Sequence, residues 1–178
     1  IEDNGNARSA KKKTLILVDD DNEMRSYLKL ELQNLYNVET YDNGKEAWAR
    51  ISTSIPDAVV TDLRMEKMDG AELCEKIKKN PGTNHIPVIL LTSATDELSQ
   101  HKCIESGADR FFTKPSSLDM LKSAIASAIS TRDTIRNKFS KEIDYGYTET
   151  QMTDSGNQLI DKVIKTIRAN MENTDFSV

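Results

Sequence analysis

The sequence has few residues of the types that bind soft metals. It contains two cysteines, Cys74 and Cys103, and two histidines, His85 and His101. The cysteines lack the spacing of a metal site, so we expect reduced thiols that act as small packing residues. Neither histidine has a metal partner at a useful spacing. The sequence therefore predicts no metal site built from sulfur or imidazole ligands.

Long apolar runs are also lacking. No stretch approaches the roughly 20 apolar residues of a membrane helix, and no segment has the pattern of a signal peptide. Charged residues make up 30% of the chain and the net charge is −5. An acidic balance argues against unaided binding to nucleic acid. We therefore expect a cytoplasmic protein that contacts neither membrane nor DNA through this segment.

Short apolar runs alternate with amphipathic segments five times. The predicted strands are residues 14–18, 37–41, the run within 55–62, 88–91 and 109–113. A helical pattern follows each run, and the last helix extends from about residue 116 towards residue 136. This alternation is typical of βαβ units, so it predicts an α/β fold with a parallel sheet and helices on both faces.

Helical spacing also predicts which residues of these helices are buried. Asp69 and Glu72 fit a capping box at the start of the third helix, and Trp48 is predicted to lie in the core. The apolar positions of the first and last helices are Met24, Leu28, Leu32 and Leu35, and Leu118, Leu121, Ile125, Ile129 and Ile135.

Polar residues stand where four of the five strands end. They are Asp19 and Asp20 after the first strand, Asp62 at the third, Thr92 at the fourth and Lys114 at the fifth. Ligands of open α/β sheets bind beyond the carboxyl ends of the strands. We therefore expect these side chains to form one site, although Asp19 and Asp20 could instead cap a helix and Lys114 could be a surface residue.

The chemistry of such a cluster points to phosphoryl transfer. Crowded carboxylates need a counter-charge, which Lys114 supplies in part. Ligands that are all oxygen, with open water positions, suit Mg²⁺. An ionised aspartate such as Asp62 can attack a phosphoryl group and form an acyl phosphate. Thr92 and Lys114 could each bind a phosphoryl oxygen, so positioning and charge compensation would drive the reaction.

Four motifs together resemble the receiver domain of two-component response regulators. They are Val18-Asp19-Asp20, Asp62 followed by Met68-Asp69-Gly70, Leu91-Thr92-Ser93-Ala94, and Lys114-Pro115. The resemblance covers about residues 13–136. It implies a flavodoxin-like fold with strand order 2-1-3-4-5, and a phosphoacceptor that takes its phosphoryl group from a kinase histidine and so controls transcription.

The resemblance also implies a role for each site residue. Asp62 would be the phosphoacceptor, and Lys114 would assist it. Mg²⁺ would be held by Asp20, Asp62 and the backbone carbonyl of Arg64, with Asp19 acting mostly through water. Thr92 would move towards the phosphoryl group, and Phe111 would be the switch aromatic, although a core position is the simpler interpretation of Phe111.

Three residues depart from the family pattern. Glu66 stands where a proline is common, Arg64 places a long basic side chain beside the site, and Phe111 lacks the hydroxyl of the commoner tyrosine. The departures leave the core function intact but put the lifetime of the phosphoryl group and the coupling of the switch in question.

The chain is predicted to divide into four segments. Residues 1–13 would be a flexible linker, 14–137 the receiver, 138–154 a linker, and 155–178 a helical segment. The last segment resembles the lead-in to an AraC-type helix-turn-helix domain, as in hybrid sensors that fuse kinase, receiver and DNA-binding domains. Its apolar stripe could serve dimerisation or cover a groove.

Phosphorylation is expected to favour a homodimer through the last two receiver helices and the fifth strand.

Three other functions are compatible with parts of the sequence. An aspartate-nucleophile phosphatase would need a second aspartate where Arg64 stands, and a flavin carrier would need a phosphate-binding loop where Asp19, Asp20 and Asp21 stand. A receiver-like binding module that is never phosphorylated remains an alternative.

Overall fold

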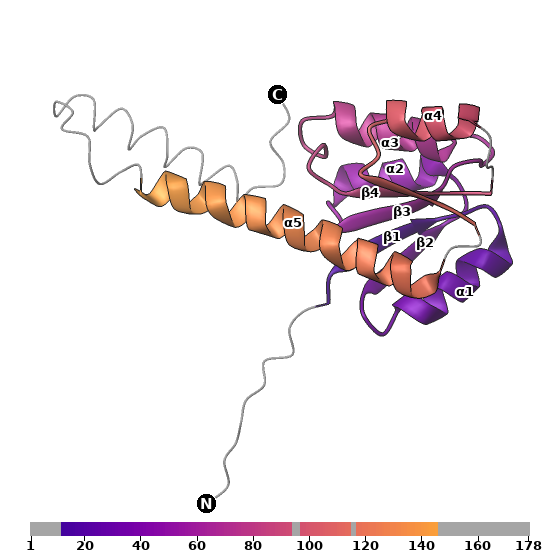
Figure 1. Cartoon of the computed structure of the whole chain (residues 1–178), viewed down its shortest axis with the longest axis horizontal. Coiled ribbons are helices and arrows are strands. Elements are labelled where there is room, and N and C mark those ends of the chain that lie inside the picture. Colours follow the sequence, from indigo (N-terminus) through magenta and orange to yellow (C-terminus); the bar gives the residue numbers. More distant parts are fainter. Residues whose placement is uncertain (1–11, 94–96, 115–116, 146–178) are drawn as a thin grey trace, which may run out of the picture. The chain divides into compact units, whose positions relative to one another are not determined.

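The described residues form an alternation of five strands and five helices (Figure 1). The computed structural model describes residues 12–93, 97–114 and 117–145. In chain order the elements are β1 (Thr14–Val18), α1 (Asn22–Leu32), β2 (Asn37–Tyr41), α2 (Gly44–Thr53), β3 (Ala58–Asp62), α3 (Gly70–Lys79), β4 (Val88–Thr92), α4 (Glu97–Glu105), β5 (Arg110–Thr113) and α5 (Leu118–Tyr145).

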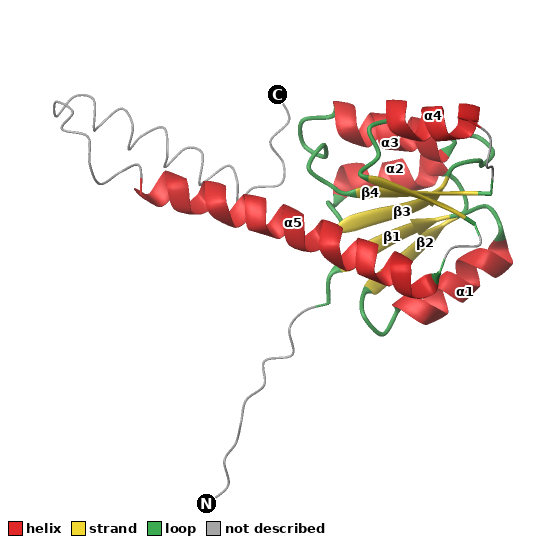
Figure 2. Cartoon of the chain, viewed as in Figure 1, coloured by secondary structure: helices red, strands yellow, loops and turns green. Residues whose placement is uncertain are grey.

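The strands form one parallel sheet in the order β2-β1-β3-β4-β5. Register pairs Leu15 with Ala58 across β1 and β3, and Leu90 with Phe111 across β4 and β5. Figure 2 shows helices α2, α3 and α4 on one face of the sheet and α1 and α5 on the other. The predicted flavodoxin-like fold is confirmed.

Alternation along β1 explains the two cores. Leu15 and Leu17 pack against α1 and α5 on one face, whereas Ile16 and Val18 pack against α2 and α3 on the other. All four side chains are fully buried, as expected for a parallel strand that is covered on both faces. The polar residues that follow such strands are thereby held at a rigid edge.

Side-chain caps start the helices that follow this edge. Asp21 accepts the backbone N–H groups of Glu23 and Met24 at the start of α1. Asp69 and Glu72 form the predicted capping box of α3. Because these caps satisfy helix N–H groups that lack backbone partners, they fix where the loops after β1 and β3 end.

Two residues predicted to be buried are exposed. Leu35 is 52% exposed because α1 ends at Leu32, and Tyr36 fills the core position after the turn. Ile135 is 51% exposed. It lies beyond Arg132, whose guanidinium reaches the backbone carbonyl of Asp57 just before β3 begins. The last helix has therefore passed the sheet at Ile135.

Helix α5 is longer than predicted. It continues to Tyr145, whereas the sequence predicted an end near residue 136 and a linker from residue 138. The stretch contains no glycine or proline before Gly146, and polar residues such as lysine and glutamate are good helix formers. Residues 1–11 and 146–178, with the predicted N-terminal linker and C-terminal helical segment, lie outside the described residues.

The chain divides into two units after Ile135. The first contains the sheet and its helices, and of the second the structure describes only residues 136–145, the end of α5. The predicted domain boundaries at residues 137 and 154 stay predictions. Among the described helices, none combines the length and the apolar character that crossing a membrane requires.

Candidate functional site

The carboxyl edge of the sheet brings four predicted site residues together. Asp19 follows β1, Asp62 and Thr92 are the last residues of β3 and β4, and Lys114 follows β5. Asp19, Asp62 and Thr92 are 1%, 5% and 1% exposed. Charged and hydroxyl side chains this deeply buried need partners.

Lys114 is the partner that the two carboxylates share. Its Nζ lies 2.8 Å from Asp19 Oδ2 and 2.5 Å from Asp62 Oδ1. The backbone N–H of Lys114 donates to the carbonyl of Thr92 at 2.7 Å. This last bond continues the β4–β5 pairing, so the sheet itself places the ammonium between the carboxylates.

The second oxygen of each carboxylate accepts a backbone N–H. Asp19 Oδ1 accepts the N–H of Asp21 at 3.0 Å, and Asp62 Oδ2 accepts the N–H of Arg64 at 2.7 Å. In both cases the donor is two residues further along the chain. Each loop thus orients the carboxylate that precedes it.

Burial and charge act in opposite directions on the two ionised groups. Burial raises the pKa of Asp62, and the ammonium of Lys114 and the N–H of Arg64 only partly counter it. Burial by itself would lower the pKa of Lys114, but Asp19 and Asp62 outweigh it and the pKa is raised. Lys114 therefore stays a cation at neutral pH, whereas burial disfavours the ionised form of Asp62.

The ligands present fit a hard divalent cation. Asp62 Oδ1 makes its ion pair with Lys114, but within the described part of the chain it accepts no hydrogen bond of good geometry. Asp20 is exposed at the same edge. No three His, Cys, Asp or Glu side chains form a ready cluster among the described residues, so the rest of a coordination shell would be carbonyl oxygen and water, as Mg²⁺ prefers.

Arg64 and Glu66 are exposed residues of the loop after β3. The Nη2 of Arg64 donates to Ser99 Oγ of α4 at 3.3 Å. Between Glu66 and Met68, Lys67 has a φ of 66°, a backbone conformation that residues other than glycine rarely adopt. The loop is therefore connected to α4 and carries one strained residue.

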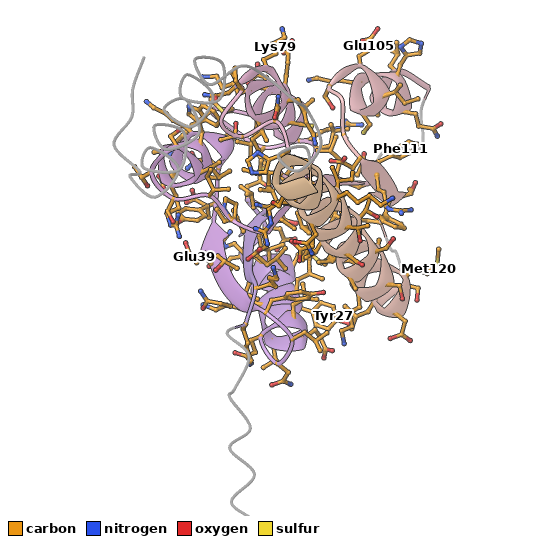
Figure 3. The ribbon with its side chains drawn as sticks, turned by 90° about the vertical axis from the view of Figure 1, so that its left-hand side faces the viewer. Tyr27, Glu39, Lys79, Glu105, Phe111 and Met120 are labelled. Atoms are coloured by element: carbon orange, nitrogen blue, oxygen red, sulfur yellow. The ribbon has the colours of Figure 1, made fainter. Side chains whose placement is uncertain are left out.

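The interpretation of Phe111 as a core residue is wrong. Its side chain is 38% exposed (Figure 3), and it lines a shallow groove with Ile104 and Ala108. Phe112 packs instead against the α1–α5 core. Because neighbouring strand residues face opposite sides, only one of the two phenylalanines can face that core. The switch role of Phe111 stays a prediction.

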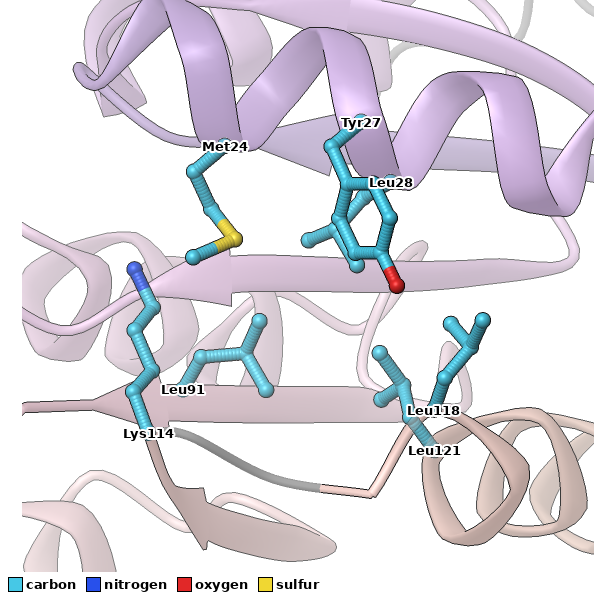
Figure 4. A pocket seen from close by; sticks show the side chains of 7 residues that line it. All are labelled: Met24, Tyr27, Leu28, Leu91, Lys114, Leu118 and Leu121. Atoms are coloured by element: carbon cyan, nitrogen blue, oxygen red, sulfur yellow. The ribbon is translucent and has the colours of Figure 1, made fainter.

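An apolar pocket borders the site and was not predicted. It measures about 210 Å³ and lies between α1 on one side and β4 and α5 on the other (Figure 4). Its lining residues are Met24, Tyr27, Leu28, Leu91, Lys114, Leu118 and Leu121. The helical spacing of Met24 and Leu28 signalled a buried face, but it did not show that the packing there would stay open beside Lys114.

In the sequence Gly70 is only part of a motif, yet in the structure it lies against the end of β3. A Cβ at this position would lie 1.9 Å from the carbonyl oxygen of Asp62. The contact of Lys102 on α4 was not predicted either. Its Nζ lies 2.6 Å from Asp69 Oδ2. Such contacts join different elements, and spacing along one element does not reveal them.

Comparisons with known proteins show the family to which this chain belongs. Residues 15–126 match the model of the response regulator receiver domain. Histidine kinase P4 of Formosa agariphila is 33% identical over 167 residues, which are 94% of this chain and 12% of that protein. The chain thus spans a small part of that relative's length.

Solved structures show the same fold. The receiver domain of a signal transduction histidine kinase from Syntrophus aciditrophicus is 31% identical, with a TM-score of 0.64 over 79% of this chain and 97% of that one. The receiver domain of a sensor histidine kinase from Pseudomonas aeruginosa, described with a magnesium ion in its active-site cleft, is 22% identical, with a TM-score of 0.63 over 67% and 98%. The chain belongs to the response regulator receiver domain family.

Proposed function

We propose that this chain is a phosphoacceptor of a two-component phosphorelay, in which Asp62 takes a phosphoryl group from a histidine of a kinase. The observation that carries the proposal is the bridge from Lys114 to Asp19 and Asp62 at the carboxyl edge of the sheet. A buried aspartate beside a fixed ammonium can act as a nucleophile towards a charged phosphoryl group.

The transfer is a displacement at phosphorus. A carboxylate oxygen of Asp62 forms the new O–P bond while the P–N bond of the phosphohistidine breaks, and the imidazole leaves with the electron pair of that bond. The ammonium of Lys114 neutralises charge on the phosphoryl oxygens, and the hydroxyl of Thr92 binds one of them. The backbone N–H of Arg64 holds the carboxylate in position.

Mg²⁺ is the cofactor that the oxygen ligands favour. Asp20, Asp62 and the carbonyl of Arg64 would hold the ion, and Asp19 would act mostly through water. When bound, the ion would supply positive charge that offsets the repulsion between the carboxylates and the incoming phosphoryl group. The exposure of Asp20 supports this assignment.

The kinase is the partner that delivers the phosphoryl group. The pocket between α1 and α5 offers a docking place beside Lys114, and Tyr27 at its rim is 51% exposed. An apolar side chain next to the phosphohistidine could enter this pocket while the phosphoryl group reaches Asp62. Docking beside the site would give proximity without a second binding surface.

Phosphorylation would act on the face formed by α4, β5 and α5, with Thr92 and Phe111 as switch residues. This face carries large apolar side chains that are exposed. Leu98, Ile104, Phe111 and Met120 are 83%, 65%, 38% and 60% exposed. Apolar patches of this kind are typical of interaction sites. We assign the face formed by α4, β5 and α5 to a homodimer of the phosphorylated chain.

The parent protein would be a cytoplasmic hybrid sensor that joins a histidine kinase and an AraC-type DNA-binding domain, and so controls transcription. The match to the Formosa kinase supports the kinase half, because it extends over 94% of this chain and beyond the family match at residues 15–126. DNA would be contacted only through the AraC-type domain, and residues 155–178 would lead into it.

Intact mass after incubation with Mg²⁺ and acetyl phosphate tests the proposal. The expected result is one phosphoryl adduct that requires Mg²⁺ and is absent from Asp62→Asn. Absence of the adduct from both chains, also after incubation with a phosphorylated kinase, would overturn phosphoacceptance in favour of a binding module. Arg64→Ala distinguishes a blocked site, since that variant would then gain the adduct.

A further inference from the structure

Arg64 forms hydrogen bonds both to Asp62 and to Ser99 of α4. Its backbone N–H donates to Asp62 Oδ2 at 2.7 Å, and its guanidinium Nη2 donates to Ser99 Oγ at 3.3 Å. The first contact lies in the site and the second on α4. A displacement of this one residue would therefore be felt at both the acceptor carboxylate and the helix.

A second polar contact joins the same helix to the same loop. Lys102, one turn after Ser99, places its Nζ 2.6 Å from Asp69 Oδ2. The other carboxylate oxygen of Asp69 accepts the N–H of Glu72 at 2.9 Å and caps α3. Residues three apart lie on one face of a helix, so α4 presents a single polar face to the loop after β3.

Apolar packing holds α4 weakly. Among its described side chains only Cys103 is buried, whereas Leu98 is 83% and Ile104 is 65% exposed. Most helices of soluble domains are stabilised chiefly by one buried apolar face. Because α4 lacks such a face, the contacts of Ser99 and Lys102 supply a large share of what fixes its position.

A phosphoryl group on Asp62 would compete for the guanidinium of Arg64. It brings a charge of about −1.5 to −2 and three strong acceptor oxygens. Arginine binds phosphate through two parallel hydrogen bonds, and charge-assisted bonds are roughly twice as strong as neutral ones. The hydroxyl of Ser99 is a neutral acceptor, so the phosphoryl group is the better partner.

We propose that the Arg64–Ser99 and Lys102–Asp69 contacts form a polar latch that holds α4 on the loop after β3, and that the phosphoryl group on Asp62 opens it by drawing Arg64 away from Ser99. The inference rests on the proposed phosphorylation of Asp62. It assigns the coupling to a side chain of the loop, and it does not require a hydroxyl on Phe111.

Hydrogen exchange of the α4 amides in the 178-residue chain tests the latch. In the unphosphorylated state, Arg64→Ala and Ser99→Ala should each raise α4 exchange rates roughly two- to fivefold, the effect of losing one exposed polar contact. Arg110→Ala is the matched control, because it breaks another exposed arginine–serine bond of 3.3 Å, to Ser127. Equal α4 exchange in all four chains would overturn the latch.

The second arm follows phosphorylation with acetyl phosphate and Mg²⁺, with the adduct counted by intact mass. The native chain should gain α4 exchange of similar size on phosphorylation, and phosphorylated Ser99→Ala should gain little more. Unchanged α4 exchange in a fully phosphorylated native chain would overturn the opening step. If no adduct forms, the proposed function and the opening step are both contradicted. The exchange rates of the unphosphorylated variants still show whether the latch exists.

Discussion

Gly70 lies so close to Asp62 that a Cβ on the glycine would be 1.9 Å from the carbonyl oxygen of the aspartate. The N–H of Gly70 also donates to the carbonyl of Leu63 at 3.0 Å. The first residue of α3 is therefore packed directly on the end of β3. The backbone of Asp62 and the start of α3 are therefore expected to move together.

Replacing Gly70 by alanine should damage both stability and phosphorylation. The neighbour of the new Cβ is backbone, which cannot turn aside as a flexible side chain would, so we expect a loss of about 3 kcal/mol in the free energy of unfolding. Urea unfolding measures the loss, and intact mass should show slower adduct formation. Gly82→Ala is the control, since its Cβ would meet only the Asn80 side chain at 3.3 Å. Equal stability of the two variants would contradict the packing argument.

Replacing Lys67 by glycine should have the opposite effect on stability. Its φ of 66° costs an ordinary residue about 1–2 kcal/mol, which exceeds the entropy that glycine adds to the unfolded chain. Lys67→Gly should therefore leave the chain equally stable or up to about 1 kcal/mol more stable in urea. Lys29→Gly, at an exposed position inside α1, should lose about 1 kcal/mol. Matching losses in the two variants would show that the loop is unstrained in solution.

Removing the buried charge of Asp62 should stabilise the fold in a pH-dependent way. Burial raises the pKa of Asp62 above its ordinary value of 3.8, so the folded chain holds this proton more tightly than the unfolded chain. The stability that the group contributes is present below its unfolded pKa and is lost as pH rises through the raised folded pKa. Asp62→Asn has no titrating group at this position, so its stability does not fall in this way as the pH rises.

Urea unfolding of Asp62→Asn and the native chain without Mg²⁺ should show the difference. The gain should be close to zero below about pH 4 and should grow as the pH rises towards 7. Asp20→Asn, which changes an exposed carboxylate at the same edge, should stay within about 0.5 kcal/mol of the native chain. A loss of stability in Asp62→Asn at pH 7 would mean that the Lys114 ion pair outweighs burial.

Lys114 is the cation that keeps two buried carboxylates together. Lys114→Gln would leave Asp19 and Asp62 facing each other without it, so we expect a loss of about 3 kcal/mol at pH 7 in the presence of a chelator. Millimolar Mg²⁺ should restore part of this loss by supplying charge. Lys122→Gln removes the surface pair with Glu31 at 3.2 Å and should lose less than about 1 kcal/mol. A loss no larger in Lys114→Gln than in this control would exclude the bridging role.

The sheet and the convergence of its polar strand ends could be predicted because they follow from local patterns. Fully apolar runs such as Leu15 to Val18 indicate strands covered on both faces, and parallel strands bring their carboxyl ends to one edge. Which residue a long side chain contacts does not follow from such local patterns. Nothing near Arg64 in the sequence indicates that its guanidinium ends on Ser99, and the exposure of Phe111 depends on which of two phenylalanines faces the core.

The end of α5 shows a different limit. Polar residues after Arg136 are compatible with both a linker and a helix, because their helix propensity is high and their solubility is the same in either state. The sequence predicted a linker from residue 138, and the helix continues to Tyr145. Only Gly146 marks a stop, and a single glycine after a polar run does not show whether the run before it is ordered.

Ile104 tests the homodimer that we propose for the phosphorylated chain. It is 65% exposed on α4, so Ile104→Asp should leave the free energy of unfolding within about 0.5 kcal/mol of the native value. A buried aspartate at an apolar interface would need a partner. Sedimentation with Mg²⁺ and acetyl phosphate should therefore show a dimer for the native chain and a monomer for the variant.

Leu30→Asp is the matched control, because Leu30 is 62% exposed on α1, across the sheet from α4. Both variants should form the phosphoryl adduct to the native extent, so a difference in association cannot come from a failure to react. Dimerisation of Leu30→Asp and not of Ile104→Asp would place the contact on the α4 face. The reverse result would move the contact to α1 and leave the exposed side chains of α4 for another partner, and a native chain that stays monomeric when fully phosphorylated would contradict the homodimer itself.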